Sequence, residues 1–276
     1  MLKDILVPLT DTDADDAALD LAVSIAAACQ ARVAALVTVQ TVQPVVLEWG
    51  AIPASVSAEI LALERERGQA LAARARERLG HVDAAEVRIA ESMLPARAVA
   101  ALHARHADLA VMAAPAGDSR DLMDDMAVDL LMQSGRPLLL VPRGHVQRAA
   151  PLHAVIAWQP TREAARAVHD ALALLHAYAS VDVLLVDPQV RDSGHGDHPG
   201  ADIAAHLARH GLRVDVVSVP RMGNTVEACI LGHVVESGAD LVVAGGYSHT
   251  RFREQILGGV TRMLLGDFPV PVLLSH

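Results

Sequence analysis

The sequence predicts an α/β protein built from two tandem, doubly wound domains. Aromatic residues make up only 2% of the 276 residues, whereas 52% are hydrophobic. The core must therefore consist of small aliphatic side chains, which suit helices packed closely on a sheet. Short apolar runs alternate with longer segments of helical periodicity, and the same order of segments occurs twice along the chain.

Each half contains five short runs that we expect to form strands. They lie near residues 4–8, 32–39, 86–90, 108–113 and 137–142 in the first half, and near 153–158, 181–186, 212–218, 240–245 and 271–275 in the second. The runs Leu184–Val186 and Leu241–Val243 are continuously apolar, which is typical of parallel strands buried on both faces. Five such strands joined by crossover helices predict a five-stranded parallel sheet in each half.

The repeat itself is visible in the letters of the sequence. HADLAVMAAP, His106–Pro115, recurs as GADLVVAGGY, Gly238–Tyr247, and a proline-initiated apolar run follows each copy. The segment RGHVQRAAP between the copies has linker character. We therefore predict one domain over residues 1–144 and a second over residues 151–276, both of ordinary domain size.

Two segments fall outside the repeated pattern. Thr41–Ile60 enlarges the first half and carries Trp49, and we interpret it as a packing flap, with a lid as the alternative. Val186–Asp202 is polar and rich in glycine, so we expect it to be mobile. Cys29 and Cys229 form neither a disulfide framework nor a zinc motif, and both are expected to be buried thiols.

The charge and hydropathy of the chain exclude several classes of function. The formal net charge of -10 argues against a general affinity for nucleic acid or for anionic membranes, both of which require a surplus of Lys and Arg. No segment approaches the ~20 apolar residues that span a bilayer. The first residues, MLKDILVPLT, contain too short an apolar run for a signal peptide, and we therefore expect a cytoplasmic location.

Motifs for catalysis and for metal binding are incomplete. Gly246–Thr250 resembles a Gly-x-Ser-x-Gly nucleophile elbow, but the last glycine is missing and no acid and histidine follow on later strands. The P-loop and the dinucleotide-binding glycine motif are both absent from the sequence. His195 and His198, with Asp192 and Asp197, lack a third rigid ligand. The sequence thus predicts no catalytic residue and no metal site.

The stretch GGYSHTRFREQILGGVTR, Gly245–Arg262, follows an apolar run and precedes a Pro-Val-Leu-Leu run. Together with the duplication, it resembles the universal stress protein family in its tandem, two-domain form. That family's signature is Gly-x2-Gly-x9-Gly-[Ser/Thr]. In this sequence, Gly245 and Gly258 match it, whereas Ser248 stands at the second glycine and Gly259 at the hydroxyl residue.

The resemblance implies strand order 3-2-1-4-5 in each half and pairing of the two halves through their last strands as a pseudo-dimer. A homodimer of two such chains remains open. It also implies an adenine-nucleotide site at the carboxyl ends of the first and fourth strands, where doubly wound sheets bind ligands. The implied nucleotide-binding residues are Gln159, Thr161, Val186, Ala244, Gly245, Ser248, Gly258, Gly259, Val260 and Thr261.

The features of this loop bear on whether it still holds a phosphate. Gly245 and Gly246 are expected to keep its first bend permissive, and Gly258 and Gly259 precede a predicted helix N-terminus. The side chains of His249, Arg251 and Arg253 are candidates for phosphate contacts, with a solvated loop paired to Glu254 as the alternative. Nucleotide-binding members carry an acid just after the first strand, where this chain has Gln159 in the second half and Thr10 in the first.

The first half is expected to have lost its site. Its segment Ala114–Asp129 keeps one glycine and gains acidic residues, and Thr10–Asp16 adds four more carboxylates around the other wall of the crevice. Carboxylates at these positions would repel a triphosphate. The acids are also expected to favour the positive end of a helix dipole.

Two functions follow from this reading. The first is a stress-response and regulatory module whose second domain binds ATP or another adenine nucleotide, with or without magnesium. The second is a scaffold that binds no nucleotide and acts through protein partners, which the sequence does not identify. Slow ATP hydrolysis is a third alternative, for which the sequence offers no general base.

Overall fold

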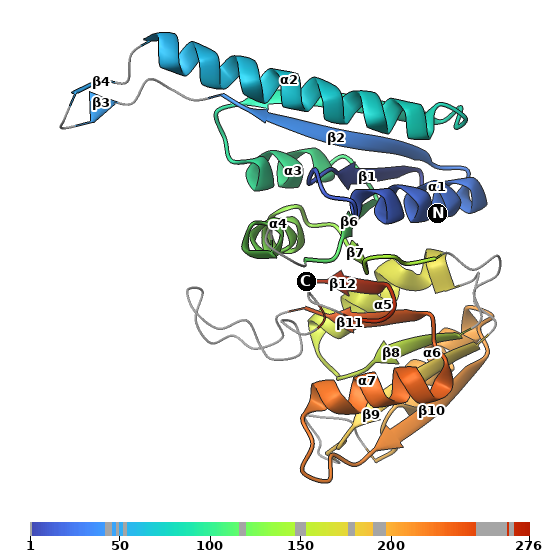
Figure 1. Ribbon diagram of the computed structural model, residues 1–276. Coiled ribbons are helices and arrows are strands. Elements are labelled where there is room, and N and C mark those ends of the chain that lie inside the picture. Colours follow the sequence, from blue (N-terminus) through green and yellow to red (C-terminus); the bar gives the residue numbers. More distant parts are fainter. Residues whose placement is uncertain are drawn as a thin grey trace.

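One ten-stranded sheet runs through the computed structural model (Figure 1). The structure describes residues 2–41, 46–47, 50–51, 54–115, 120–146, 153–175, 180–189, 197–246, 264 and 268–276. The strands of this sheet follow the order β10-β9-β8-β11-β12-β7-β6-β1-β2-β5. Each half of the chain thus contributes five neighbouring strands.

The first half forms a parallel sheet of the predicted order. Its strands are β1 (Asp4–Pro8), β2 (Arg32–Gln40), β5 (Ala85–Ser92), β6 (Leu109–Ala113) and β7 (Leu138–Val141). They pair as β5-β2-β1-β6-β7, which is the order 3-2-1-4-5. All five predicted strands of this half are confirmed, because β-branched and leucine runs buried on both faces leave little ambiguity.

The second half repeats this arrangement. Its strands are β8 (His153–Ala157), β9 (Ser180–Val186), β10 (Val214–Val219), β11 (Leu241–Gly245) and β12 (Val272–Ser275), again in the order 3-2-1-4-5. The last strands of the halves, β12 and β7, pair antiparallel, with Leu273 opposite Leu139. This junction confirms the pseudo-dimer. The boundaries at residues 144 and 151 stay predictions, since 147–152 lie outside the described residues.

Helices cover both faces of the sheet. One apolar core contains residues of α1 (Asp15–Cys29), α2 (Ala54–Leu79), α5 (Arg162–Leu175) and α6 (Ala201–Arg209). The core on the other face contains residues of α3 (Ala96–Ala104), α4 (Arg120–Gln133) and α7 (Val226–Ser237). Alanines occupy many of the helix positions in both cores, so the helices approach the sheet closely without aromatic residues.

The aspartate of the repeated Ala-Asp-Leu tripeptide accepts backbone hydrogen bonds from the start of the first strand in both halves. The Asp108 carboxylate accepts hydrogen bonds from the backbone N–H groups of Lys3 and Asp4, at 2.6 and 3.1 Å. In the second half, the Asp240 carboxylate accepts one from the backbone N–H of His153 at 3.4 Å. Each aspartate thereby ties the start of the fourth strand of its half to the start of the first.

Two expectations are wrong in part. Thr41–Ile60 is more than a loop: β3 (Val46–Leu47) pairs with β4 (Gly50–Ala51), and α2 already begins at Ala54. Figure 1 shows α2 extending beyond the end of the sheet towards this hairpin. Cys229 is buried as expected, but Cys29 is only half-buried. None of the described helices is both long and apolar enough to cross a bilayer.

Candidate functional site

The second half brings five of the predicted nucleotide-binding residues to one edge of the sheet. Ala244 and Gly245 end β11, Val186 ends β9, and Gln159 and Thr161 lie in the turn between β8 and α5. Strand β8 lies between β9 and β11, so these residues surround the point where the order of strands reverses.

The remaining candidates lie outside the described residues. They are Ser248, Gly258, Gly259, Val260 and Thr261, together with the charge candidates His249, Arg251 and Arg253. Their assignment to a nucleotide stays a prediction. His195 and the other residues of 190–196 also lie outside the described residues, so their expected mobility stays a prediction. Among the described residues, no cluster of three or more His, Cys, Asp or Glu side chains could hold a metal ion.

The turn after β8 is fixed by hydrogen bonds of its own. The Thr161 hydroxyl accepts from the backbone N–H of Ala164 at 3.2 Å, so it caps the first turn of α5. The Thr161 N–H donates to the Gln159 carbonyl at 2.8 Å. The side chain of Gln159 is exposed. At this edge, the side-chain amide of Gln159 is therefore exposed to a ligand, whereas the Thr161 hydroxyl already accepts a hydrogen bond from α5.

Gly245 is required by the packing of a helix, which sequence reasoning missed. A Cβ at this position would lie 2.5 Å from the Ala164 nitrogen and 2.7 Å from the Glu163 carbonyl carbon, both in the backbone of α5. A Cβ at Gly246 would lie 2.7 Å from Leu131 of α4, in the other half. Neither glycine has a positive φ. The expected backbone freedom is thus not used here, and both glycines allow close approach of neighbouring elements instead.

A buried acid stands beside these glycines. Glu163 in the first turn of α5 is only 4% exposed, and its carboxylate accepts a hydrogen bond from Arg162. Burial opposes its ionisation, but hydrogen bonds from Arg162 and from its own backbone N–H, with the charges of Arg162 and His276, lower the pKa of Glu163 below its ordinary value. In sequence, Glu163 reads as an ordinary acid of a first helical turn, so nothing there signals its burial.

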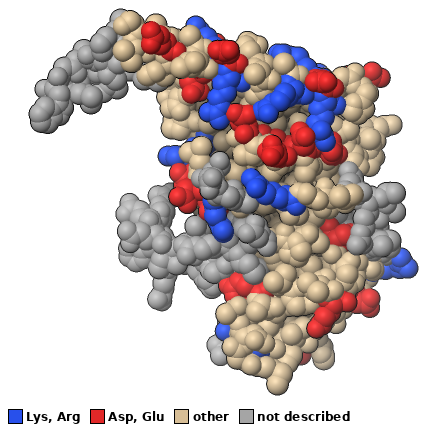
Figure 2. Space-filling view, viewed as in Figure 1, with Lys and Arg blue, Asp and Glu red and all other residues tan. Residues whose placement is uncertain are grey.

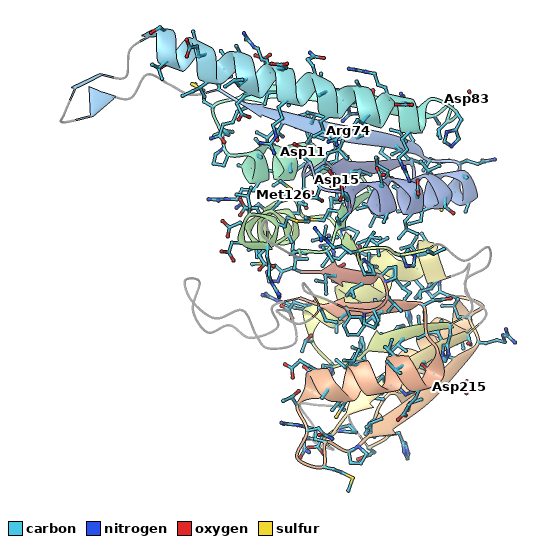
Figure 3. The ribbon with its side chains drawn as sticks, in the orientation of Figure 1. Asp11, Asp15, Arg74, Asp83, Met126 and Asp215 are labelled. Carbon is cyan, nitrogen blue, oxygen red and sulfur yellow. The ribbon has the colours of Figure 1, made fainter. Side chains whose placement is uncertain are left out.

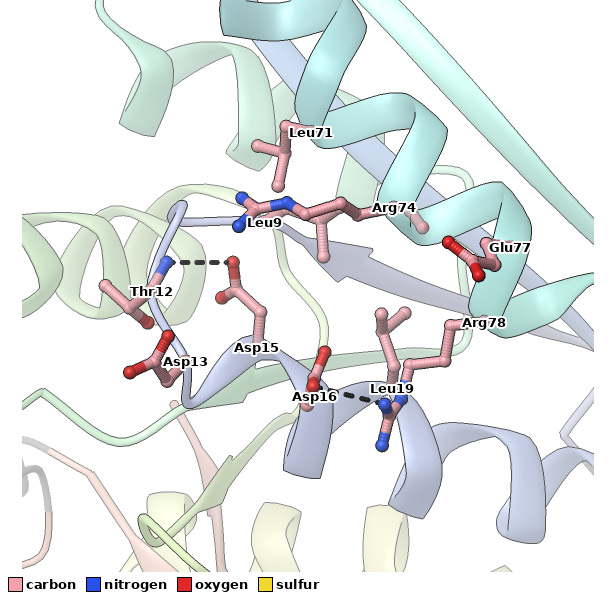
Figure 4. Close-up of a pocket in the computed structure, with 11 residues that line it drawn as sticks. Leu9, Thr12, Asp13, Asp15, Asp16, Leu19, Leu71, Arg74, Glu77 and Arg78 are labelled. Carbon is pink, nitrogen blue, oxygen red and sulfur yellow. Dashed lines mark hydrogen bonds and ion pairs between the residues drawn. The ribbon is translucent and has the colours of Figure 1, made fainter.

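The turn after β1 in the first half is built around a different acid. Asp15 is 5% exposed, and its carboxylate accepts from the backbone N–H of Thr10 at 2.9 Å and from the Thr10 hydroxyl at 2.7 Å. It also accepts from the Thr12 N–H at 3.3 Å (Figure 4). Burial raises the pKa of Asp15 above its ordinary 3.8, and these hydrogen bonds offset part of the increase.

The exposed acids of this turn are paired with arginines of α2. Asp11 accepts hydrogen bonds from Arg67, at 2.6 Å, and from Arg74. Arg78 donates to Asp16 at 3.1 Å and also pairs with Asp20 at 2.6 Å. Figure 2 shows acidic and basic side chains interleaved on this part of the surface, and Figure 3 shows Asp11 close to Arg74 of α2. Repulsion by bare carboxylates, which the sequence suggested, is therefore largely cancelled here, and α2 itself covers this wall of the first half.

A pocket of about 330 Å³ remains between α1 and α2 (Figure 4). Its floor is apolar, formed by Leu9, Leu19, Leu71 and Ala75, and its charged rim contains Asp13, Asp15, Asp16, Arg74, Glu77 and Arg78, with Thr12 beside them. Carboxylates outnumber arginines on this rim. The pocket consequently offers no surplus of positive charge to an anionic ligand, and the loss of the site expected for the first half stays a prediction.

Asp182 is a further buried carboxylate, and the sequence analysis did not identify it. Asp182 of β9 lies 2.9 Å from Nε2 of His153 in β8 and 2.7 Å from Nε2 of His233 in α7. Its side chain is only 8% exposed. In the apolar strand SVDVLLV, an acid facing the core is tolerated because imidazoles from two other elements meet it.

Comparisons with known proteins agree with this architecture. Residues 150–276 match the universal stress protein family. A universal stress protein from Archaeoglobus fulgidus DSM 4304 aligns over 99% of this chain and 96% of its own, with a TM-score of 0.64 and 14% identity. A functionally unknown protein from Pseudomonas aeruginosa PAO1 aligns over 99% and 92%, with a TM-score of 0.60 and 14% identity. A comparison with curated proteins found no match. The structural likeness covers both halves and shows the shared fold.

Proposed function

We propose that this chain, whose residues 150–276 form a domain of the universal stress protein family, is a stress-response module that binds ATP or another adenine nucleotide in its second half. It acts by regulation and does not turn the nucleotide over. The observation that carries the proposal is the placement of Gln159, the capped first turn of α5 and the end of β11 around one switch point.

The charge distribution favours the second half over the first. In the first half, the turn after β1 is occupied by Asp15 and covered by Arg67, Arg74 and Arg78 of α2, which are already paired with acids. In the second half, the exposed side chain after β8 is an uncharged amide, Gln159. Only the second half also has two glycines at the end of its fourth strand. We therefore expect one nucleotide per chain.

One observation favours the alternative of a scaffold that binds protein partners. Glu163 places a negative charge beside the end of β11, close to where a phosphate would lie. Unless its charge is balanced, this acid weakens the attraction of the site for a polyphosphate. Arg162 supplies part of that balance.

Equilibrium dialysis of the full chain with ATP, with and without magnesium and at physiological salt, tests the proposal. We expect saturable binding of one molecule per chain at nucleotide concentrations up to millimolar. Gln159→Asp should strengthen binding, because it supplies the acid that nucleotide-binding members of the family carry after the first strand. Thr10→Asp makes the matched change in the first half and should leave binding unchanged.

The alternatives predict other results. A complete lack of saturable binding, in the native chain and in Gln159→Asp alike, would contradict the proposal and support the scaffold. Two molecules per chain would instead show that the first half retains a site. Release of phosphate during the incubation would contradict a role without turnover.

A further inference from the structure

The outer edge of β10 has no partner strand in the part of the chain that the structure describes. β10 is the last strand at one end of the sheet, and it pairs with β9 on its inner side. The Arg213 carbonyl accepts from the Val181 N–H of β9 at 3.0 Å, so the backbone of residue 213 faces inward. Because the backbone of a strand alternates in direction, the N–H and C=O groups of Val214, Val216 and Ser218 face outward.

The two ends of the sheet differ in how their edges are protected. β5, the edge strand of the first half, carries Glu86 and Arg88, which pair with each other, and Glu91, which pairs with an arginine of α2 at 2.8 Å. Charged side chains of this kind hinder the addition of another strand. β10 carries one charged residue, Asp215, among four valines and a serine. The side chain of Val216 is 42% exposed, so this edge is both apolar and accessible.

The chain itself contains a model for the missing partner. Its two halves already join by antiparallel pairing of edge strands, with Leu273 of β12 opposite Leu139 of β7. Pairing of β10 with a second copy of itself about a two-fold axis is antiparallel as well, and it closes after two chains. Each chain has a net charge of -10, but Figure 2 shows charged side chains crowded over the first half and sparse on the visible face of the second.

The sequence of β10 selects one register for such a pair. With Val216 opposite its counterpart, Val214 of each copy exchanges two backbone hydrogen bonds with Ser218 of the other, and Asp215 lies opposite a valine. The neighbouring register on one side places the two copies of Asp215 opposite each other, with Cα atoms about 4.5 Å apart, which is destabilising. The neighbouring register on the other side places Pro220, which has no N–H, opposite Val214.

We propose that two copies of this chain associate through β10, antiparallel and centred on Val216, so that their sheets join into one. The backbone groups of the outward-facing residues then find partners, and the exposed Val216 side chains contact each other. One strand of six residues forms the contact. The dimer is therefore weak and reversible, with a dissociation constant of about 1–100 μM. The association requires no nucleotide, so it is independent of the proposed function.

Sedimentation equilibrium of the full chain without ligand, over about 1–300 μM protein, tests the association. The average mass should rise with concentration from that of one chain towards that of two. Val216→Lys places a charge on both sides of the contact and should weaken the dimer at least about tenfold. Val56→Lys, which changes a valine of α2 that is 41% exposed, is the matched control and should leave the dimer unchanged. A single chain at every concentration, or a dimer equally strong in Val216→Lys, would overturn the proposal.

Hydrogen exchange of the native chain gives a second test that involves no substitution. The amides of Val216 and Ser218 should exchange at least about fivefold more slowly at the high end of this concentration range than at the low end, because pairing protects them. The amide of Val217 faces β9 and should be protected at both ends. Exchange of the Val216 and Ser218 amides that is independent of protein concentration would show that the chains do not pair through β10. Circular dichroism of Val216→Lys confirms that a lost dimer reflects the contact and not unfolding.

Discussion

Adding one methyl group at Gly245 tests how β11 packs on α5. In Gly245→Ala, the new Cβ would lie 2.5, 2.7 and 3.0 Å from three backbone atoms of Glu163 and Ala164. Carbon contacts normally begin at about 3.5 Å, so the strand and the helix must separate by roughly 1 Å. Both are rigid and buried, and no flexible side chain can move aside. We expect the free energy of unfolding to fall by about 2–3 kcal/mol, the upper part of the range of about 1–3 kcal/mol that is typical of overpacked cores.

Urea unfolding followed by circular dichroism measures this loss of stability. Two substitutions, Gly232→Ala and Ala113→Gly, serve as controls. Gly232 of α7 has no atom within 4 Å of a built Cβ. Gly232→Ala should therefore be neutral or stabilise by up to about 1 kcal/mol. Ala113→Gly, at the matching position of the first half, should cost only about 1 kcal/mol. Unfolding of Gly245→Ala at the same urea concentration as the native chain would refute the packing argument.

Three further predictions concern buried and paired acids. Because burial raises the pKa of Asp15 above 3.8, the folded state binds its proton more tightly than the unfolded state, so its contribution is most favourable at acid pH. Unfolding of the native chain and Asp15→Asn across about pH 4–7 should show the native chain losing stability relative to the variant as pH rises, and the opposite trend would contradict this sign. Asp182→Ala removes the hydrogen-bond partner of His233 and the charged contact of His153, and it should cost about 1–3 kcal/mol in urea unfolding. Asp215→Ala, which changes an exposed acid on the neighbouring strand, should cost less than about 0.5 kcal/mol. Asp11→Ala should cost less than about 1 kcal/mol in the same assay, since the arginines it pairs with are mostly exposed, and a larger loss would mean that this pairing is structural.

The strands were predictable from the sequence because they depend on local and repeated signals. Each strand is a short apolar run, and the copy of HADLAVMAAP as GADLVVAGGY fixes the fourth strand of both halves at once. The strand order 3-2-1-4-5 and the pseudo-dimer were implied by the family resemblance rather than by the residues. Nothing in the letters of Leu138–Val141 specifies that this run pairs antiparallel with Val272–Ser275.

The features that the sequence analysis did not predict involve residues whose partners are distant in sequence. The sequence predicts a loop at the start of α2, because glycine and prolines precede this segment and it lacks a clear apolar stripe of helical spacing. Its arginines find their acids in the turn after β1, more than 50 residues away in sequence. Asp182 was overlooked within an apolar run for the same reason, since His233 reaches it from α7.

Gly245 in the candidate site shows the same contrast between a signal in the sequence and a contact that only the structure reveals. The glycine signature indicated that Gly245 matters, and the structure agrees, but the physical reason differs from the one that the signature suggested. A substitution such as Gly245→Val would break the contact between β11 and α5 before it reported on any ligand. Loss of nucleotide binding in that variant would therefore say nothing about a phosphate cradle, and Gln159→Asp is the more informative change.

The junction of the two halves gives the first half a structural role beside the candidate site of the second. Leu138, Leu139 and Leu140 of β7 are fully buried, and they pair with β12. At the end of β11, Leu131 of α4 fills the space above Gly246. Removing the first half would expose one edge of β12 and uncover Gly246. The first half thus supports both β12 and the end of β11, so the candidate site should be assayed in the full chain.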